Sequence, residues 1–203
     1  MITVEIDQAQ LAKVEFMLAG IKDGSSTVLM RSINKTLSGV QTDLNKETRK
    51  ILNIKASRVK KDMSVYKATK TRLRGQVDSS GRPVGLTNFT GTAQRKSGVS
   101  VSVRKDTPRT ILKRAFIATG LNNNTHVFWR TWHGVKRDGV ASVHYAKLPR
   151  RYRLPIKTLY GPRIQDIQSD PAVINPVQNA AGVRLKTNIN HELSYFLEKY
   201  NNG

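Results

Sequence analysis

The side chains best suited to chemistry in this chain are four histidines, His126, His133, His144 and His191. No two of them stand at the i, i+4 spacing that would place two imidazoles and a nearby carboxylate on one helix face around a metal ion. The pattern favours ordinary packed or surface histidines over metal ligands. We therefore expect no metal site and no cofactor.

Acidic residues and nucleophiles are also sparse. Asp166 and Asp170 stand where helices are expected to begin, so capping explains them better than general acid–base chemistry. The chain has no cysteine, which excludes disulfides, thiolate metal sites and cysteine nucleophiles. It also has no Walker loop and no Gly-x-Ser-x-Gly elbow, and the missing carboxylate cluster argues against a metal-dependent nuclease. The sequence predicts a protein that is not an enzyme.

Positive charge is the dominant chemical feature of the chain. Its 203 residues include 35 Lys+Arg against 14 Asp+Glu, a formal net charge of +21. A domain this basic repels itself unless a polyanion or an acidic partner lies close to it. Nucleic acid is the leading class of partner, and an acidic protein surface is the second. A membrane surface comes third, because no basic amphipathic terminus or lipidation signal is present.

The densest basic segment covers residues 46–74, where eleven Lys/Arg are opposed only by Glu47 and Asp62. A merely solvated face usually mixes both signs, so this imbalance favours a surface that faces a polyanion. Its contacts would be to phosphates, because no base-reading module is recognisable. The candidate contacts to nucleic acid or an acidic partner are Lys46, Arg49, Lys50, Lys55, Arg58, Lys60, Lys61, Arg72 and Arg74.

A second basic stretch, residues 147–163, has six Lys/Arg, no acid, and apolar residues beside a backbone break. Leu159 and Tyr160 directly precede Gly161-Pro162, which stops regular structure. Such residues are costly to leave in water, so they either pack on the body of the protein or meet another chain. The predicted protein interface consists of Leu154, Pro155, Ile156, Leu159, Tyr160, Gly161 and Pro162. Trp129 and Trp132 are placed on opposite faces of a strand, one in the core and the other as an interface anchor.

Hydrophobic spacing predicts helices towards both ends of the chain. Steps of three and four along residues 26–52 put Leu29, Ile33, Leu37, Val40 and Leu44 on one helix face. Shorter helices are expected after Asp7 and over residues 57–63. A C-terminal helix is expected over residues 171–203, with Asn175 as an N-cap and Pro176 at the first helical position.

The middle of the chain has the alternation typical of strands. Val99, Val101 and Val103 alternate with serines, and other strands are expected over residues 2–6, 84–89, 111–119, 125–132 and 140–145. These elements predict one α+β domain over residues 1–203, with residues 1–24 as an N-terminal strand/helix arm. We expect an antiparallel sheet of about four or five strands, packed by the long N-terminal helix and the C-terminal helix. The apolar face of residues 26–52 should cover Val99, Val101 and Val103, unless this helix is an arm that packs only on a neighbouring subunit.

No targeting segment is evident. The first residues lack the basic region and apolar run of a secretory signal, and no window approaches the ~18 apolar residues of a membrane span. We expect a protein made in a cytoplasm, without a membrane partner.

Several segments, taken in order, form a wider pattern. They are residues 31–37 (RSINKTL), 80–86 (SGRPVGL), 98–103 (GVSVSV), 114–119 (RAFIAT), 127–130 (VFWR) and 154–162 (LPIKTLYGP). Together they resemble the minor tail protein Z family of tailed bacteriophages, also called tail-completion proteins. The resemblance covers about residues 25–167. The sequence departs from the family pattern at residues 129–143, which include an extra basic loop. The resemblance is weak beyond Pro171.

The resemblance implies a structural virion protein without catalysis. Such a protein would complete the tail at its head-proximal end, at the neck, beside the terminator, the tube and the head–tail connector. It would form a homo-oligomeric ring around the viral DNA, for which six copies would match tail symmetry. The alternative is a free nucleic-acid-binding protein that contacts phosphates through its basic surface, which explains the charge but not the apolar segment at residues 154–162.

Overall fold

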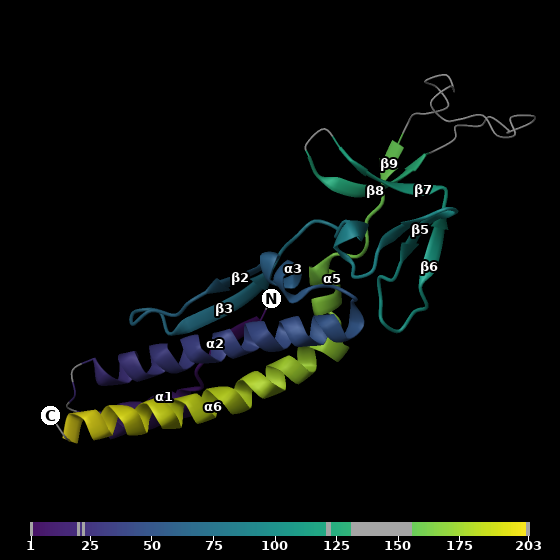
Figure 1. The fold of residues 1–203 in the computed structure, drawn as a ribbon. Helices are drawn as coiled ribbons and strands as arrows, with labels where there is room; N and C mark the ends of the chain where they lie inside the picture. The colour runs from purple at the N-terminus through teal and green to yellow at the C-terminus, as the bar shows by residue number, and fades with distance from the viewer. Residues whose placement is uncertain (1, 20, 22, 121–122, 131–155, 202–203) are drawn as a thin grey trace, which may run out of the picture. The chain divides into compact units, whose positions relative to one another are not determined.

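The computed structural model describes residues 2–19, 21, 23–120, 123–130 and 156–201, and Figure 1 shows their helices and strands in chain order. The chain forms two compact units. Unit 1 contains residues 1–49, 56–81 and 164–203, and unit 2 contains residues 50–55 and 82–163. The chain thus leaves unit 1 and later returns to it. One domain over residues 1–203, with residues 1–24 as an arm, stays a prediction.

Unit 1 combines helices with one small sheet. Its elements are β1 (Ile2–Glu5), α1 (Gln8–Met17), α2 (Gly24–Ile51, whose last residues enter unit 2), α3 (Ala56–Lys61), β2 (Met63–Tyr66), β3 (Arg74–Ser79), α5 (Ile164–Gln168) and α6 (Pro171–Asn201). The strands pair in the antiparallel order β1-β3-β2, and Val77 on β3 lies opposite both Ile2 and Val65. Residues 2–5 are therefore part of this sheet.

The apolar face of α2 is buried within unit 1. Ile33 and Leu37 are fully buried, and both approach β3 at Gly75, where a Cβ atom would lie only 2.3 Å from a methyl group of Leu37. The helix is therefore covered by its own chain and needs no neighbouring subunit to bury this face. The predicted cover over Val99, Val101 and Val103 stays a prediction. Those three residues belong to unit 2, whereas within unit 1 it is Gly75 that lets β3 approach α2 closely.

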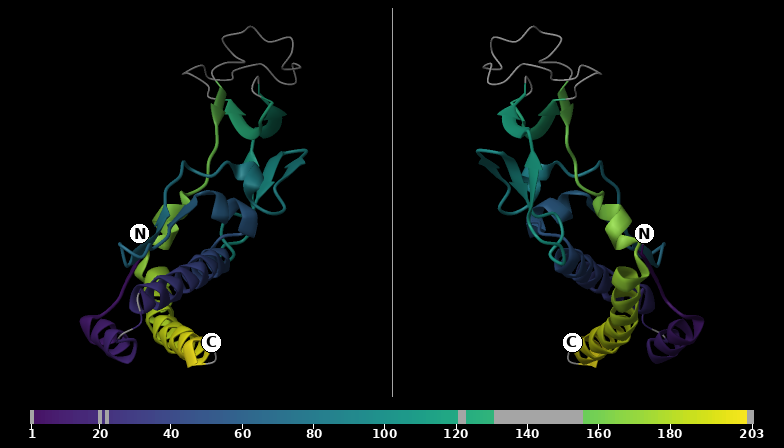
Figure 2. Two further views of the ribbon diagram at one scale, coloured as in Figure 1. Left: turned by 90° about the vertical axis from the view of Figure 1, so that its left-hand side faces the viewer. Right: turned by 90° about the vertical axis from the view of Figure 1, so that its right-hand side faces the viewer.

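Helices α2 and α6 lie side by side in unit 1 (Figures 1 and 2). An ion pair of 2.7 Å joins Arg184 to Asp43 on α2. The apolar stripe of α6 is buried and consists of Val173, Val177, Ala181, Leu185, Ile189 and Leu193. The predicted start of this helix was wrong in one respect, since Asp170 rather than Asn175 caps it. The Asp170 carboxylate accepts a hydrogen bond from the Ala172 amide at 2.9 Å, and Pro171 takes the first helical position.

Unit 2 is mainly β-structure. Its elements are η1 (Leu86–Asn88), β4 (Ala93–Arg95), β5 (Gly98–Val101), β6 (Thr110–Lys113), β7 (Ala115–Thr119), β8 (Thr125–Arg130) and β9 (Ile156–Thr158). They form two three-stranded antiparallel sheets, β4-β5-β6 and β7-β8-β9. The buried residues Leu52 and Ile54 join this unit through single bridges to Arg104 and Phe89.

The α+β class is confirmed, but the strands among the described residues form three sheets of three instead of one sheet of four or five. The expected strand over residues 111–119 is divided at Arg114, whose φ of 65° cannot continue a pleated strand. The expected strand over residues 84–89 is a short 3₁₀ helix. The strand expected over residues 140–145 and the side chain of Trp132 lie outside the described residues.

Candidate functional site

An apolar groove of about 380 Å³ lies on unit 2. Trp129, Leu159 and Tyr160 line it. Trp129 is 46% exposed and Tyr160 is 54% exposed. The other lining residues are Leu86, Val101, Val103, Thr107, Pro108, Thr110 and Leu112. The groove therefore gathers side chains from both sheets of unit 2 and from η1.

The segment that carries Leu159 and Tyr160 is fixed by backbone pairing on both sides. The Leu159 amide donates to the Val127 carbonyl at 2.9 Å, and the Gly161 amide donates to the Val84 carbonyl at 2.7 Å. Gly161 is required for close packing, because a Cβ atom there would lie 2.7 Å from the Phe89 ring. Tyr160 is thus held at the groove by an ordered backbone.

Five of the seven predicted interface residues lie among the described residues. Leu159 and Tyr160 line the groove, Ile156 is exposed on β9, and Gly161 and Pro162 anchor the segment to Val84. Leu154 and Pro155 lie outside the described residues. Sequence reasoning did not identify Leu86 and Leu112 as groove residues, since only the fold brings them to Tyr160.

The nine predicted basic contacts do not form one cluster. Lys46 and Arg49 lie on α2, and the start of α3 is tied to that helix by the Asn45 side chain, which donates to the Ala56 carbonyl at 3.0 Å. Lys60 and Lys61 follow on α3, just before β2. These four exposed residues are therefore in one region of unit 1.

The remaining predicted basic contacts are placed differently. Arg72 and Arg74 stand at the end of the β2–β3 ladder away from α3, because Met63 pairs with Ser79. Arg58 is half-buried and pairs with Asp62 at 2.7 Å, and Arg74 pairs with Glu5 at 2.8 Å. Lys50 and Lys55 belong to unit 2. Arg58 and Arg74 thus already have carboxylate partners within the chain.

The described titratable groups offer little for catalysis. His126 lies on β8 with its ring centroid 6.4 Å from that of Tyr160, and His191 is exposed on α6. His133 and His144 fall outside the described residues. Hydrogen bonds from the Arg104 guanidinium lower the pKa of the Asp106 carboxyl. Within the described ranges, no three His, Asp or Glu side chains come together as metal ligands, and no helix has the length and apolarity to cross a membrane.

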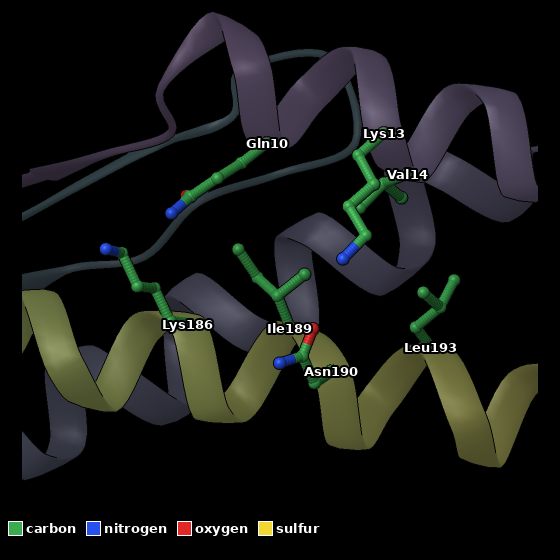
Figure 3. Close-up of a pocket in the computed structure, with 7 residues that line it drawn as sticks. All are labelled: Gln10, Lys13, Val14, Lys186, Ile189, Asn190 and Leu193. Carbon is green, nitrogen blue, oxygen red and sulfur yellow. The ribbon is translucent and has the colours of Figure 1, made fainter.

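A smaller hollow of about 240 Å³ lies between α1 and α6 in unit 1 (Figure 3). Val14, Ile189 and Leu193 supply its apolar wall, and Lys13 and Lys186 bring two ammonium groups to its rim. Its remaining lining residues carry only amide groups, so it has no acid or nucleophile for a reaction.

A model of the family described as prophage minor tail protein Z (GPZ) matches residues 17–201 of the 203. The chain belongs to this family. The match confirms the resemblance and extends it through α6. No curated protein and no solved structure matches the chain.

Membership of the minor tail protein Z family assigns the chain a structural role in the phage tail. It also places the protein in the virion, among other tail proteins. An exposed apolar groove and a strongly basic surface are features of binding, which agrees with a structural role.

Proposed function

We propose that this protein completes the tail at its head-proximal end and helps form the head–tail junction, as a ring around the DNA channel. The observation that carries the proposal is the groove formed by Trp129, Leu159 and Tyr160 in a chain of the minor tail protein Z family. Its neighbours there would be the terminator, the tube and the head–tail connector.

The composition of the groove supports a protein partner. Aromatic residues that remain half-exposed beside aliphatic ones are typical anchors of protein–protein contacts. Because Leu159 and Tyr160 are fixed by pairing to Val127, Val84 and Gly85, little ordering entropy would be lost when a partner covers them. We propose that the groove is a contact between copies in the ring or between this ring and the next. A heterologous contact whose rotation closes gives a ring, and six copies would match the symmetry of a tail.

The net charge supports a position at the DNA channel. A ring of subunits that each carry +21 would repel itself strongly without a polyanion. We propose that Lys46, Arg49, Lys60 and Lys61 face DNA or an acidic neighbouring protein in the assembled tail.

The test is a groove variant, Leu159→Ser with Tyr160→Ser, in a phage that lacks the wild-type gene. We expect a folded protein and a loss of infectious particles, with electron micrographs showing tails that fail to join heads. The matched control is Val183→Ser with Tyr195→Ser, which removes an exposed aliphatic and an exposed aromatic residue from α6. Normal particle yield from the groove variant would refute the proposal.

The net charge of +21 also favours a second candidate, a free nucleic-acid-binding protein. This candidate predicts that purified particles lack the protein and that tails assemble normally without it. Quantifying the protein in purified virions therefore separates the two functions, since only the tail-completion function requires it there.

A further inference from the structure

The positive charge of the chain is concentrated in unit 2. Residues 50–55 and 82–163 contain 19 Lys/Arg and two acidic residues, whereas the rest of the chain contains 16 Lys/Arg and twelve acidic residues. Unit 2 therefore carries a net charge of +17 out of +21. One of its two acids, Asp106, is hydrogen-bonded to Arg104, with a nitrogen–oxygen distance of 3.0 Å.

Four exposed cations of unit 2 gather at one corner of the β4-β5-β6 sheet. Arg95 ends β4, Lys96 is in the following turn, Lys113 ends β6, and Arg114 precedes β7. We call these four residues the basic corner. The Arg114 amide donates to the Ser97 carbonyl at 3.2 Å, which holds the β6 end against the β4–β5 turn.

The strand register places two of these cations in one row across the sheet. Arg95 and Lys113 both lie opposite Gly98, so the three residues form one row across the sheet. Directly opposed residues point to the same face of an antiparallel sheet, and two strand spacings separate Arg95 from Lys113 by roughly 10 Å. A polyanion with regularly spaced charges could therefore contact both cations at once.

The backbone at Arg114 is a second, independent observation. Arg114 has φ of 65°, in the left-handed region that glycine adopts at lower cost. The other two described non-glycine residues with positive φ are Asp23 and Asn123, and these types tolerate that region better. An arginine, rather than a glycine, at such a position favours a role for its side chain.

We propose that the basic corner binds the phosphate backbone of duplex DNA. Among the described residues, none of its four cations forms an ion pair. Asp106, the acid that unit 2 has among these residues, pairs with Arg104. The inference rests on the proposed function only in its choice of DNA as the polyanion. It places this contact in unit 2, outside the basic segment of residues 46–74.

The test uses the full chain and a fluorescent duplex of about 20 base pairs in two unrelated sequences, with binding followed by anisotropy as salt is raised. The corner variant combines Arg95→Gln, Lys96→Gln, Lys113→Gln and Arg114→Gly. The control variant combines Lys13→Gln, Arg31→Gln, Lys186→Gln and Lys199→Gln, four exposed residues of unit 1. Both variants lose four charges, so only the place of the loss differs.

We expect the corner variant to bind both duplexes at least about tenfold more weakly than wild type, because phosphate contacts dominate such affinities. Each lost phosphate contact should reduce the slope of log affinity against log salt by about 0.9, so three or four contacts give a change of about 3. The control variant should stay within about threefold of wild type. Equal losses in both variants would reduce the effect to net charge and overturn the proposal. Loss of binding to labelled polyglutamate with unchanged DNA binding would assign the corner to an acidic protein and also overturn it.

Two smaller variants keep the test decisive if the fourfold change impairs folding. Arg114→Gly alone should melt at or above the wild-type temperature and reduce the salt slope by about 1, and Arg95→Gln with Lys113→Gln should reduce it by about 2. An unchanged slope in both would refute the proposal. The Leu159→Ser, Tyr160→Ser variant should bind DNA like wild type, so failure in tail joining and failure in DNA binding are read out separately.

Discussion

At the scale of single residues, two buried threonines on α2 join this helix to the C-terminal part of unit 1. Thr36 accepts a hydrogen bond from the Asn188 side chain at 2.9 Å and donates to the Ser32 carbonyl at 2.8 Å. Thr48 accepts from the Gln168 side chain at 3.0 Å and donates to the Leu44 carbonyl at 2.6 Å. Thr36 thus satisfies the buried Asn188 amide, and Thr48 shares the buried Gln168 amide with the Met63 sulfur, which lies 3.8 Å from it.

Replacement of Thr36 by Val tests this account. The change keeps the shape of the side chain but leaves the Asn188 amide without its acceptor, so we expect the free energy of unfolding to fall by about 1–3 kcal/mol. The control is Thr42→Val, because Thr42 makes the same bond to its own helix, to Ser38 at 2.9 Å, but is exposed. The control should change stability by less than about 0.5 kcal/mol in urea melts. Similar losses in both variants would contradict the role of the buried amide.

Sequence reasoning at this scale identified residue types better than their surroundings. It singled out Leu159 and Tyr160 because a Gly-Pro break follows them, and the structure places both at a groove. It assigned Arg58 to a surface that contacts nucleic acid or an acidic partner, but in the structure Arg58 pairs with Asp62, four residues further along the chain. It missed the basic corner, because Arg95-Lys96 and Lys113-Arg114 are two short pairs in the sequence that meet only through strand register.

At the scale of elements, glycine has opposite effects in the two units. Gly98 at the start of β5 has φ of 152°, and a Cβ atom there would lie 2.0 Å from the Leu112 carbonyl oxygen. Gly182 lies within α6, and a Cβ atom there would meet nothing within 4 Å. Gly98 is required, because its φ and the nearby Leu112 carbonyl both disfavour a side chain. Gly182 only adds flexibility to a helix.

Alanine at each position should therefore act in opposite directions. Gly98→Ala must displace β6 or the backbone of β5, and we expect a loss of at least about 2 kcal/mol in stability. Gly182→Ala should gain about 0.5–1 kcal/mol, the usual advantage of alanine inside a helix. Thermal melting of both variants checks the pair. A Gly98→Ala protein as stable as wild type would mean that the approach of β5 to β6 is not tight.

The helices were more predictable than the strands for a physical reason. The helix expected over residues 26–52 is α2. It could be predicted because its buried apolar residues recur at helical spacing within that one segment of the chain. Strands depend on partners far away in the chain, and β3 gave little signal because Gly75 and basic residues interrupt its alternation. The division between β6 and β7 depends on the positive φ of Arg114, which the spacing of apolar residues does not predict.

At the scale of the whole molecule, the path of the chain and the distribution of charge follow the same division. Unit 1 is formed by both ends of the sequence, and unit 2 is formed mostly by the segment between them. The nearly balanced unit 1 has a buried helical core, whereas unit 2 carries most of the positive charge and the apolar groove. A count over the whole sequence could show the charge of +21 but not that one unit holds most of it.

Because both chain ends build unit 1, the C-terminal segment should be required for its fold. A chain that stops at Arg163 lacks α5 and α6, and with them the Asp43–Arg184 ion pair, the Thr36–Asn188 hydrogen bond and the apolar stripe of α6. The side of α2 that these contacts cover would then face water. Helices in proteins owe most of their stability to such packing. We expect far-UV circular dichroism to lose more helix than the removed residues contribute, as α2 melts too.

The strands of unit 2 should respond differently to the same truncation. Residues 50–55 and 82–163 all remain, so amide signals of Val99, Val101 and Val127 should stay dispersed in nuclear magnetic resonance spectra. Removal of residues 199–203 alone is the control, because Lys199 and Tyr200 are exposed and their loss should leave the melting temperature nearly unchanged. A truncated chain that keeps the helix of α2 and melts like the full protein would show that residues 1–81 fold without the C-terminal helix. The buried polar contacts between α2 and α6 would then only dock a helix onto a unit that is already formed.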